Sequence, residues 1–260
     1  MKKFLKLGIF ALALLPLSLL SACGQLDYEP KLDVNSAGAY SASTKTELNE
    51  IATDETTLQP KTITGYRMTM TMKEEGMNMK ANVIATLNDE QQLEMAMKIN
   101  MSTEGTGYEG SANMEIYMPV GEYMYANIDY SVSGAVDFNI DGKYKVPADE
   151  GFGIEEIAFD SAMDFDDMLD MVDELSGNGF TIEKATRDTK TNFKVSIEEN
   201  TVYEIPATTM YFLFDNGALV GYSLDMGETM KIVVEAFDGT IQFPSFDNYR
   251  EENPFEALGM

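Results

Sequence analysis

Apolar and polar residues alternate along most of the chain between about residues 61 and 249. The stretch YRMTMTMKEEGMNMK, residues 66–80, places methionines at every second position of two short runs, and the same period continues through residues 93–101 and 110–118. A period of two is typical of half-buried strands, because successive side chains point to opposite faces of a sheet. Short turns rich in Gly, Asn and Glu separate the runs, which predicts antiparallel neighbours.

One segment breaks this pattern and predicts a helix. In DSAMDFDDMLDMVDELSGNG, residues 160–179, apolar side chains recur at helical spacing, Asp160 or Ser161 can cap the start and Gly177 can end the helix. The alternation returns from residue 180. There Asn216 and Gly217 predict a hairpin turn, because both central positions of that turn favour positive φ. The whole pattern predicts about ten or eleven strands and one main helix.

The size of the predicted sheet decides the fold class. Ten strands spaced by about 4.8 Å make a sheet about 48 Å wide, whereas a helix of about 16 residues is about 24 Å long and about 10 Å across. One helix cannot cover such a face, and apolar surfaces of this size are rarely left in water. The sequence therefore predicts a mainly β (α+β) fold: a curved antiparallel half-barrel of about ten strands, with the helix packed against its concave face beside a cavity.

The methionines of the strands are the main candidates for ligand binding. Methionine has a flexible side chain and a polarizable sulfur, so it adapts to hydrophobic ligands of variable shape. A lined cavity and a filled core fit the pattern equally well. A less favoured interpretation is Cu(I) binding, since Met-x-Met places thioethers about 7 Å apart on one strand face. The predicted cavity residues are Met68, Met70, Met72, Met79, Met95, Met97, Ile99, Met114, Ile116, Met118, Phe165, Met168, Leu169 and Val172.

The first 22 residues have the anatomy of a secretory leader. Three lysines precede an apolar run that contains Gly8 and Pro16 and ends in small residues, so the run is too short and interrupted for a membrane span. The end of the run, LSAC, resembles the lipobox of bacterial lipoproteins, in which the cysteine receives a diacylglycerol thioether. Cys23 is therefore the predicted lipidation site. Two acyl chains anchor a protein stably without crossing the membrane, which predicts a location on the extracytoplasmic face of the cell membrane.

The remaining chain divides by composition into three parts. Residues 23–60 are polar and rich in Ser and Thr, which predicts a lipidated, flexible tether with a short helix around residues 46–52. Residues 61–249 form the predicted half-barrel domain. Residues 250–260 form a short C-terminal tail.

Charge and composition narrow the possible functions. The chain has 18 Lys+Arg against 44 Asp+Glu, no histidine and one cysteine. It therefore lacks the parts for disulfides, Cys/His zinc sites and histidine-based triads. Nucleic acid is an implausible partner, because phosphate binding needs clustered cations. No carboxylate pair is marked for acid–base work, so we predict no enzyme activity, no cofactor and no metal.

The layout resembles a known group of surface proteins. A lipobox, a polar tether, alternating strands that open with YRMTMTMK, one helix, and the closing segments FDNGALVGYSL and IQFPSF are similar to Gram-positive lipoproteins of the LolA/LolB-like superfamily, which includes mycobacterial LppX and LprG. The resemblance covers about residues 61–247. It implies an antiparallel half-barrel wrapped on helices, with a hydrophobic cavity that carries lipid or lipoprotein acyl chains.

Two functions of different classes follow from these observations. The favoured hypothesis is a membrane-anchored protein that binds a lipid or another hydrophobic molecule in the methionine-rich cavity. The alternative is a non-catalytic surface interaction or sensor module, in which the acidic outer face meets a protein partner.

Overall fold

The computed structural model describes residues 25–52, 65–74, 76–90, 92–105, 108–134, 137–147, 180–199 and 206–254. These residues form thirteen strands and one helix, so the mainly β class is confirmed. Eleven of the strands have eight or more residues, close to the number predicted. The elements are β1 (Ser41–Ala42), α2 (Lys45–Ala52), β2 (Gly65–Glu74), β3 (Met77–Leu87), β4 (Leu93–Gly105), β5 (Tyr108–Met118), β6 (Tyr123–Ser133), β7 (Phe138–Pro147), β8 (Phe180–Arg187), β9 (Lys190–Ile197), β10 (Thr208–Asp215), β11 (Ala218–Asp225), β12 (Met230–Phe237) and β13 (Arg250–Glu251).

The chain divides into two compact units, where the sequence predicts a single domain over residues 61–249. Unit one comprises Met1–Tyr28, Met70–Ile154 and Gly239–Met260, and unit two comprises Glu29–Thr69 and Glu155–Asp238. Each unit is built mostly from antiparallel strands that are neighbours in the chain.

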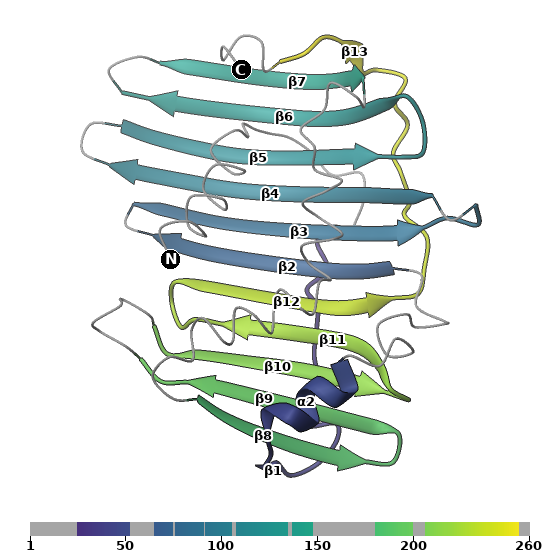
Figure 1. Ribbon diagram of the computed structural model, residues 1–260. Coiled ribbons are helices and arrows are strands. Elements are labelled where there is room, and N and C mark those ends of the chain that lie inside the picture. Colours follow the sequence, from purple (N-terminus) through teal and green to yellow (C-terminus); the bar gives the residue numbers. More distant parts are fainter. Residues whose placement is uncertain are drawn as a thin grey trace. The chain divides into compact units, whose positions relative to one another are not determined.

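Strands β3 to β7 of unit one follow one another as an antiparallel meander (Figure 1). The pairing is in direct register, with Val83 opposite Met97, Met97 opposite Ile116, and Ile116 opposite Ala126. The two-residue strand β13 pairs in parallel with β7 at Tyr144 and Lys145. The first residues of the predicted C-terminal tail therefore extend this sheet.

The register gives the meander of unit one two chemically different faces. The methionine face carries Met79, Ala81, Val83, Ala85, Met95, Met97, Ile99, Ala112, Met114, Ile116, Met118, Met124, Ala126, Ile128, Ile140, Tyr144 and Val146. The polar face carries the residues between them, including Asn82, Lys98, Glu115 and Asn127. This is the separation that a period of two predicts.

Unit two has the strand order β1-β8-β9-β10-β11-β12. Its core combines β-branched and aromatic side chains, among them Phe193, Val195 and Phe212, with Leu48 of helix α2 packed against them. Helix α2 lies against β9 and β10 of this unit (Figure 1). The predicted hairpin is confirmed, because Asn216 and Gly217 connect β10 to β11 with φ of 51° and 83°. The short helix predicted near residues 46–52 corresponds to α2.

The segment before α2 packs onto the sheet of unit two, on the face opposite to the one that α2 covers. The Lys31 amide donates a hydrogen bond of 3.0 Å to the Glu235 carboxylate, and the Asn192 side-chain amide donates one of 3.1 Å to the Val34 carbonyl. Ala37 is buried. The chain then forms β1 along β8 before it enters α2, whose first turn is capped by the Thr44 hydroxyl.

For residues 25–52 the structure replaces the expected flexible tether with a packed segment. Its buried side chains, Leu26, Ala37 and Leu48, are widely spaced and follow no strand or helix period. Hydrogen bonds from side chains of distant strands hold the backbone between them. Such contacts leave no periodic signal in the sequence, which is why composition alone predicts a tether here.

Several predicted segments lie outside the described residues: the leader at 1–22, Cys23, and the helix expected within 160–179. Within the described ranges, α2 is the one helix, and no helix there has the length and apolar character needed to cross a bilayer.

Candidate functional site

The methionine face gathers half of the predicted cavity residues onto three neighbouring strands of unit one, β3, β4 and β5. They are Met79, Met95, Met97, Ile99, Met114, Ile116 and Met118. Six of them are buried, and Met118 is half-buried. The shared face is confirmed by the register, whereas the lining of a cavity remains a prediction.

Small residues on the same face lie beside the long ones. Ala85 is opposite Met95, Ala81 is opposite Ile99, and Ala126 is opposite Ile116. An alanine beside a methionine leaves the flexible thioether room to change rotamer, which two β-branched neighbours would not. The face therefore combines adaptable side chains with short ones.

The other predicted residues do not all join this face. Met72 is buried and Met70 half-buried on β2. Met68, on the same strand, packs against the core of unit two. Phe165, Met168, Leu169 and Val172 lie outside the described residues.

A row of polar side chains crosses the polar face, and no pattern in the sequence predicts it. Asn82, Lys98, Glu115 and Asn127 lie directly opposite one another on β3, β4, β5 and β6. Asn82, Glu115 and Asn127 are all less than 8% exposed. Each looks in the sequence like an ordinary solvent-facing strand residue, so only the register and the burial reveal the row.

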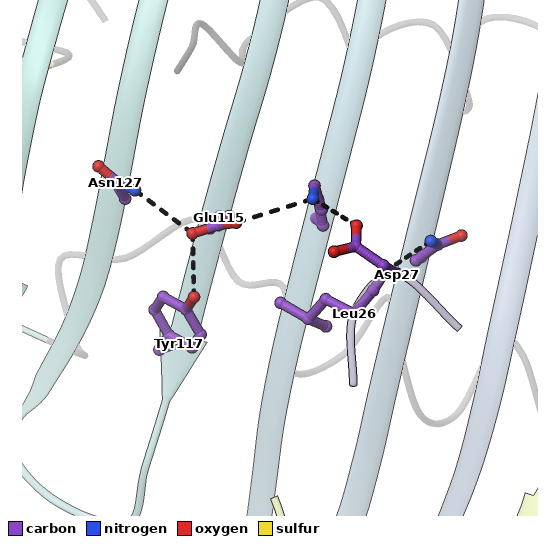
Figure 2. A network of polar contacts seen from close by, with 7 residues as sticks. Leu26, Asp27, Glu115, Tyr117 and Asn127 are labelled. Carbon is purple, nitrogen blue, oxygen red and sulfur yellow. Dashed lines mark hydrogen bonds and ion pairs between the residues drawn. The ribbon is translucent and has the colours of Figure 1, made fainter. Parts of the chain in front are cut away.

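Glu115 is the centre of this polar row (Figure 2). Its Oε2 accepts hydrogen bonds from the Tyr117 hydroxyl at 3.0 Å and from the Asn127 side-chain amide at 3.3 Å. Its Oε1 lies 4.0 Å from the Lys98 ammonium. A buried carboxylate is tolerated when such partners replace the lost water. Burial raises the pKa of Tyr249 to about 12, and the charge of Glu115 adds to that rise.

The polar row also holds the N-terminal end of the described chain. The Asn82 side-chain amide donates a hydrogen bond of 2.6 Å to the Leu26 carbonyl, and the Lys98 ammonium lies 2.5 Å from the Asp27 carboxylate (Figure 2). The Gln25 side chain donates to the Thr240 carbonyl at 3.1 Å and accepts from the Gln242 amide at 2.9 Å. We call Gln25, Leu26 and Asp27, with these partners, the N-terminal latch.

An aromatic cluster covers the neighbouring part of the polar face. Phe246 stacks on Tyr125 with ring centroids 3.8 Å apart, and Phe243 meets Tyr117 edge to face at 6.4 Å. Tyr249 packs edge to face against Tyr125 at 5.5 Å. The IQFPSF segment, quoted above for the resemblance, thus contributes Phe243 and Phe246 to a cover of this sheet.

The two faces of the meander differ in chemistry. In the part of the chain that the structure describes, no three His, Cys, Asp or Glu residues are grouped to hold a metal. Tyr117 and Asn127 donate hydrogen bonds to the buried carboxylate of Glu115 and so replace the water that it loses. The methionines, alanines and isoleucines of the methionine face are apolar, and the methionine side chains are flexible.

Comparison with known proteins finds a weak structural likeness. No family model matches the chain, and no curated protein matches it. Among solved structures, the crystal structure of LprF from Mycobacterium bovis is similar, with a TM-score of 0.39 and 12% identity, over 79% of this chain and 99% of that chain. Because the identity and the score are both low, the function has to be argued from the chain's own residues.

Proposed function

We propose that the protein is a lipid-anchored extracytoplasmic protein that binds a lipid, an acyl chain or another hydrophobic molecule on the methionine face of unit one. In this proposal the strands curve as a half-barrel, and Cys23 carries the diacylglycerol anchor. The supporting observation is the methionine face itself, where five methionines and four isoleucines of neighbouring strands are buried together. Strands usually favour β-branched and aromatic residues at such positions.

Binding would be driven by the removal of apolar surface from water. Each Å² of apolar ligand surface buried contributes roughly 25 cal/mol. Methionine side chains reorient at low cost, so selectivity would come from the length and bulk of the ligand. The proposal involves no chemical step, and it requires no cofactor.

The test separates bound lipid from the covalent anchor. The Cys23→Ser variant carries no thioether, so any lipid that co-purifies with it is bound non-covalently. We expect native mass spectrometry of this variant to detect a lipid adduct. Met97→Trp, on the methionine face, should remove the adduct, whereas Met226→Trp, at a half-buried methionine of unit two, should keep it. An adduct-free Cys23→Ser protein that also fails to bind a fluorescent fatty acid would contradict the proposal.

A surface interaction module is the second candidate, and one observation favours it. Asn78, Ser102, Ser111, Ser131 and Asn139 form an exposed row across β3 to β7, directly opposite one another. Asn and Ser are generally disfavoured in strands, and in recognition surfaces they supply adaptable hydrogen bonds. The row is neutral, unlike the acidic outer face that the sequence suggests. Loss of a captured partner in Ser111→Lys, with lipid binding unchanged, would favour this candidate.

A further inference from the structure

We propose that the N-terminal latch holds unit one directly against the surface of the membrane, with the lipid headgroups as the partner of the region around Gln25, Thr240 and Gln242. This inference rests on the proposed lipidation of Cys23. It goes further, because it states which part of the body lies next to the bilayer and how firmly it is held there.

The latch fixes three consecutive residues by different contacts. The Gln25 side chain bridges to Thr240 and Gln242, which belong to the segment that follows β12. Leu26 is 1% exposed, and its carbonyl accepts a hydrogen bond from Asn82. Asp27 pairs with Lys98. A segment with a buried apolar side chain, a buried hydrogen bond and an ion pair belongs to the folded body.

The distance along the chain then limits the distance to the membrane. Gly24 is the one residue between Cys23 and Gln25. Consecutive Cα atoms are about 3.8 Å apart, so the Cα of Gln25 lies at most about 7.6 Å from that of Cys23. A free tether of the kind the composition suggests would instead give an average separation of about 33 Å between anchor and body. With the latch in place, the linker between the lipid anchor and the folded part of the protein is one residue long.

The negative charge of the protein is the reason that the length of this linker matters. With a net charge of −26, the body is repelled by anionic lipid, and a body on a long tether would move outward from such a surface. A body held by the latch cannot move outward. The anchored protein should therefore keep its distance from the bilayer whatever the lipid charge.

Fluorescence resonance energy transfer from a donor dye on the protein to an acceptor dye on the lipid headgroups tests the inference. The full chain, lipidated at Cys23, is placed in phosphatidylcholine vesicles that carry a headgroup acceptor dye, with increasing phosphatidylglycerol. A donor dye is attached at Thr240→Cys, where the backbone carbonyl and not the side chain contacts Gln25 of the latch, or at Asn139→Cys on β7 as the matched control. Both positions are exposed, and β7 lies four strands from β3, about 19 Å at the usual strand spacing.

We expect stronger transfer from position 240 than from position 139, unchanged by phosphatidylglycerol. An insert of about ten Gly and Ser residues between Gly24 and Gln25 leaves the latch intact and lengthens only the link. It should reduce the transfer at position 240 and make it fall further as phosphatidylglycerol increases. The pair Asn82→Ala and Lys98→Ala, which opens the latch, should act in the same direction.

Two results would overturn the inference: equal transfer from the two positions, or transfer at position 240 that the insert does not change. Mass spectrometry of the same samples reports on Cys23 separately. A protein without the diacylglycerol group contradicts the proposed anchor and with it this inference, whereas a lipidated protein with equal transfer contradicts the latch alone. Lipid binding by the Cys23→Ser variant is independent of either result.

Discussion

The two units bury strand residues of different kinds. The core of unit two is built from Phe193, Phe212, Phe214 and β-branched residues, closed by Leu48 of α2. The methionine face of unit one uses methionine, alanine and isoleucine on strands of the same type. Aromatic and β-branched side chains have few rotamers and favour one packing, whereas methionine accepts many. Similar strands thus bury stiff side chains in one unit and flexible side chains in the other.

Alkaline pH should produce the largest loss of stability and affect both units. Burial raises the pKa of Tyr66 in unit two and of Tyr249 in unit one from 10.0 to about 12. The folded state then keeps protons that the unfolded state releases near pH 10. The stabilising contribution is complete below pH 10 and is lost as the pH rises to about 12. Urea unfolding followed by circular dichroism should show this loss.

Two substitutions show how much each unit contributes to the loss of stability at alkaline pH: Tyr66→Phe in unit two and Tyr249→Phe in unit one. Each variant should remove part of the pH dependence, because phenylalanine fills most of the same volume and has no proton to lose. A pH profile that neither substitution changes would show that other groups cause the alkaline loss.

The next largest effect should be a difference between the two units in the stability lost when a buried side chain is truncated. Phe212→Ala deletes a ring that is 1% exposed in the core of unit two, and we expect a loss of about 4 kcal/mol in the free energy of unfolding. Met97→Ala should cost less, about 2 kcal/mol, the lower end for a buried methionine, because neighbouring thioethers can move into the space. Equal losses in urea titrations would mean that the methionine face is a filled core, as rigid as that of unit two.

The polar row of unit one should respond to charge more than to shape. Glu115→Ala leaves Tyr117 and Asn127 without their shared acceptor and should cost about 2 kcal/mol. Glu115→Gln keeps an oxygen acceptor and should cost less. Thermal unfolding of the two variants measures the difference. If Glu115→Gln is as damaging as Glu115→Ala, the contact with Lys98 matters more than the hydrogen bonds.

The smallest effect on stability should come from stiffening the methionine face. Met97→Leu nearly conserves volume and should cost less than about 1.5 kcal/mol. The same change should reduce the range of acyl chains that the Cys23→Ser protein retains, since leucine has fewer rotamers. Met226→Leu in unit two is the control. An unchanged lipid profile in Met97→Leu would remove the reason for linking methionine to ligand binding.

Some features of this molecule were readable from short segments. The period of two predicted strands and correctly grouped Met79, Met97 and Met114 with their neighbours on one face. Asn216 and Gly217 predicted their hairpin, because the backbone angles of that turn depend on those two residues alone. The short helix α2 was predicted near its true position.

Other features depended on contacts between distant segments. Met68 has the same local pattern as Met79, yet it packs against the core of unit two. Asn82 and Glu115 read as solvent-facing residues, yet the register and the cover from residues 25–28 and 243–249 bury them. Nothing within either strand records what lies on top of it.

The sequence by itself determined the long strands that the structure describes, the separation of apolar from polar faces and the acidic character of the chain, because each of these follows from neighbouring residues. Only the tertiary structure decided that residues 25–52 are packed, that four polar side chains lie in line, and that Asn82 and Lys98 hold the N-terminal segment. These contacts join residues 56 and 71 positions apart, and their energies depend on the register and on exclusion of water, which exist only in the folded sheet.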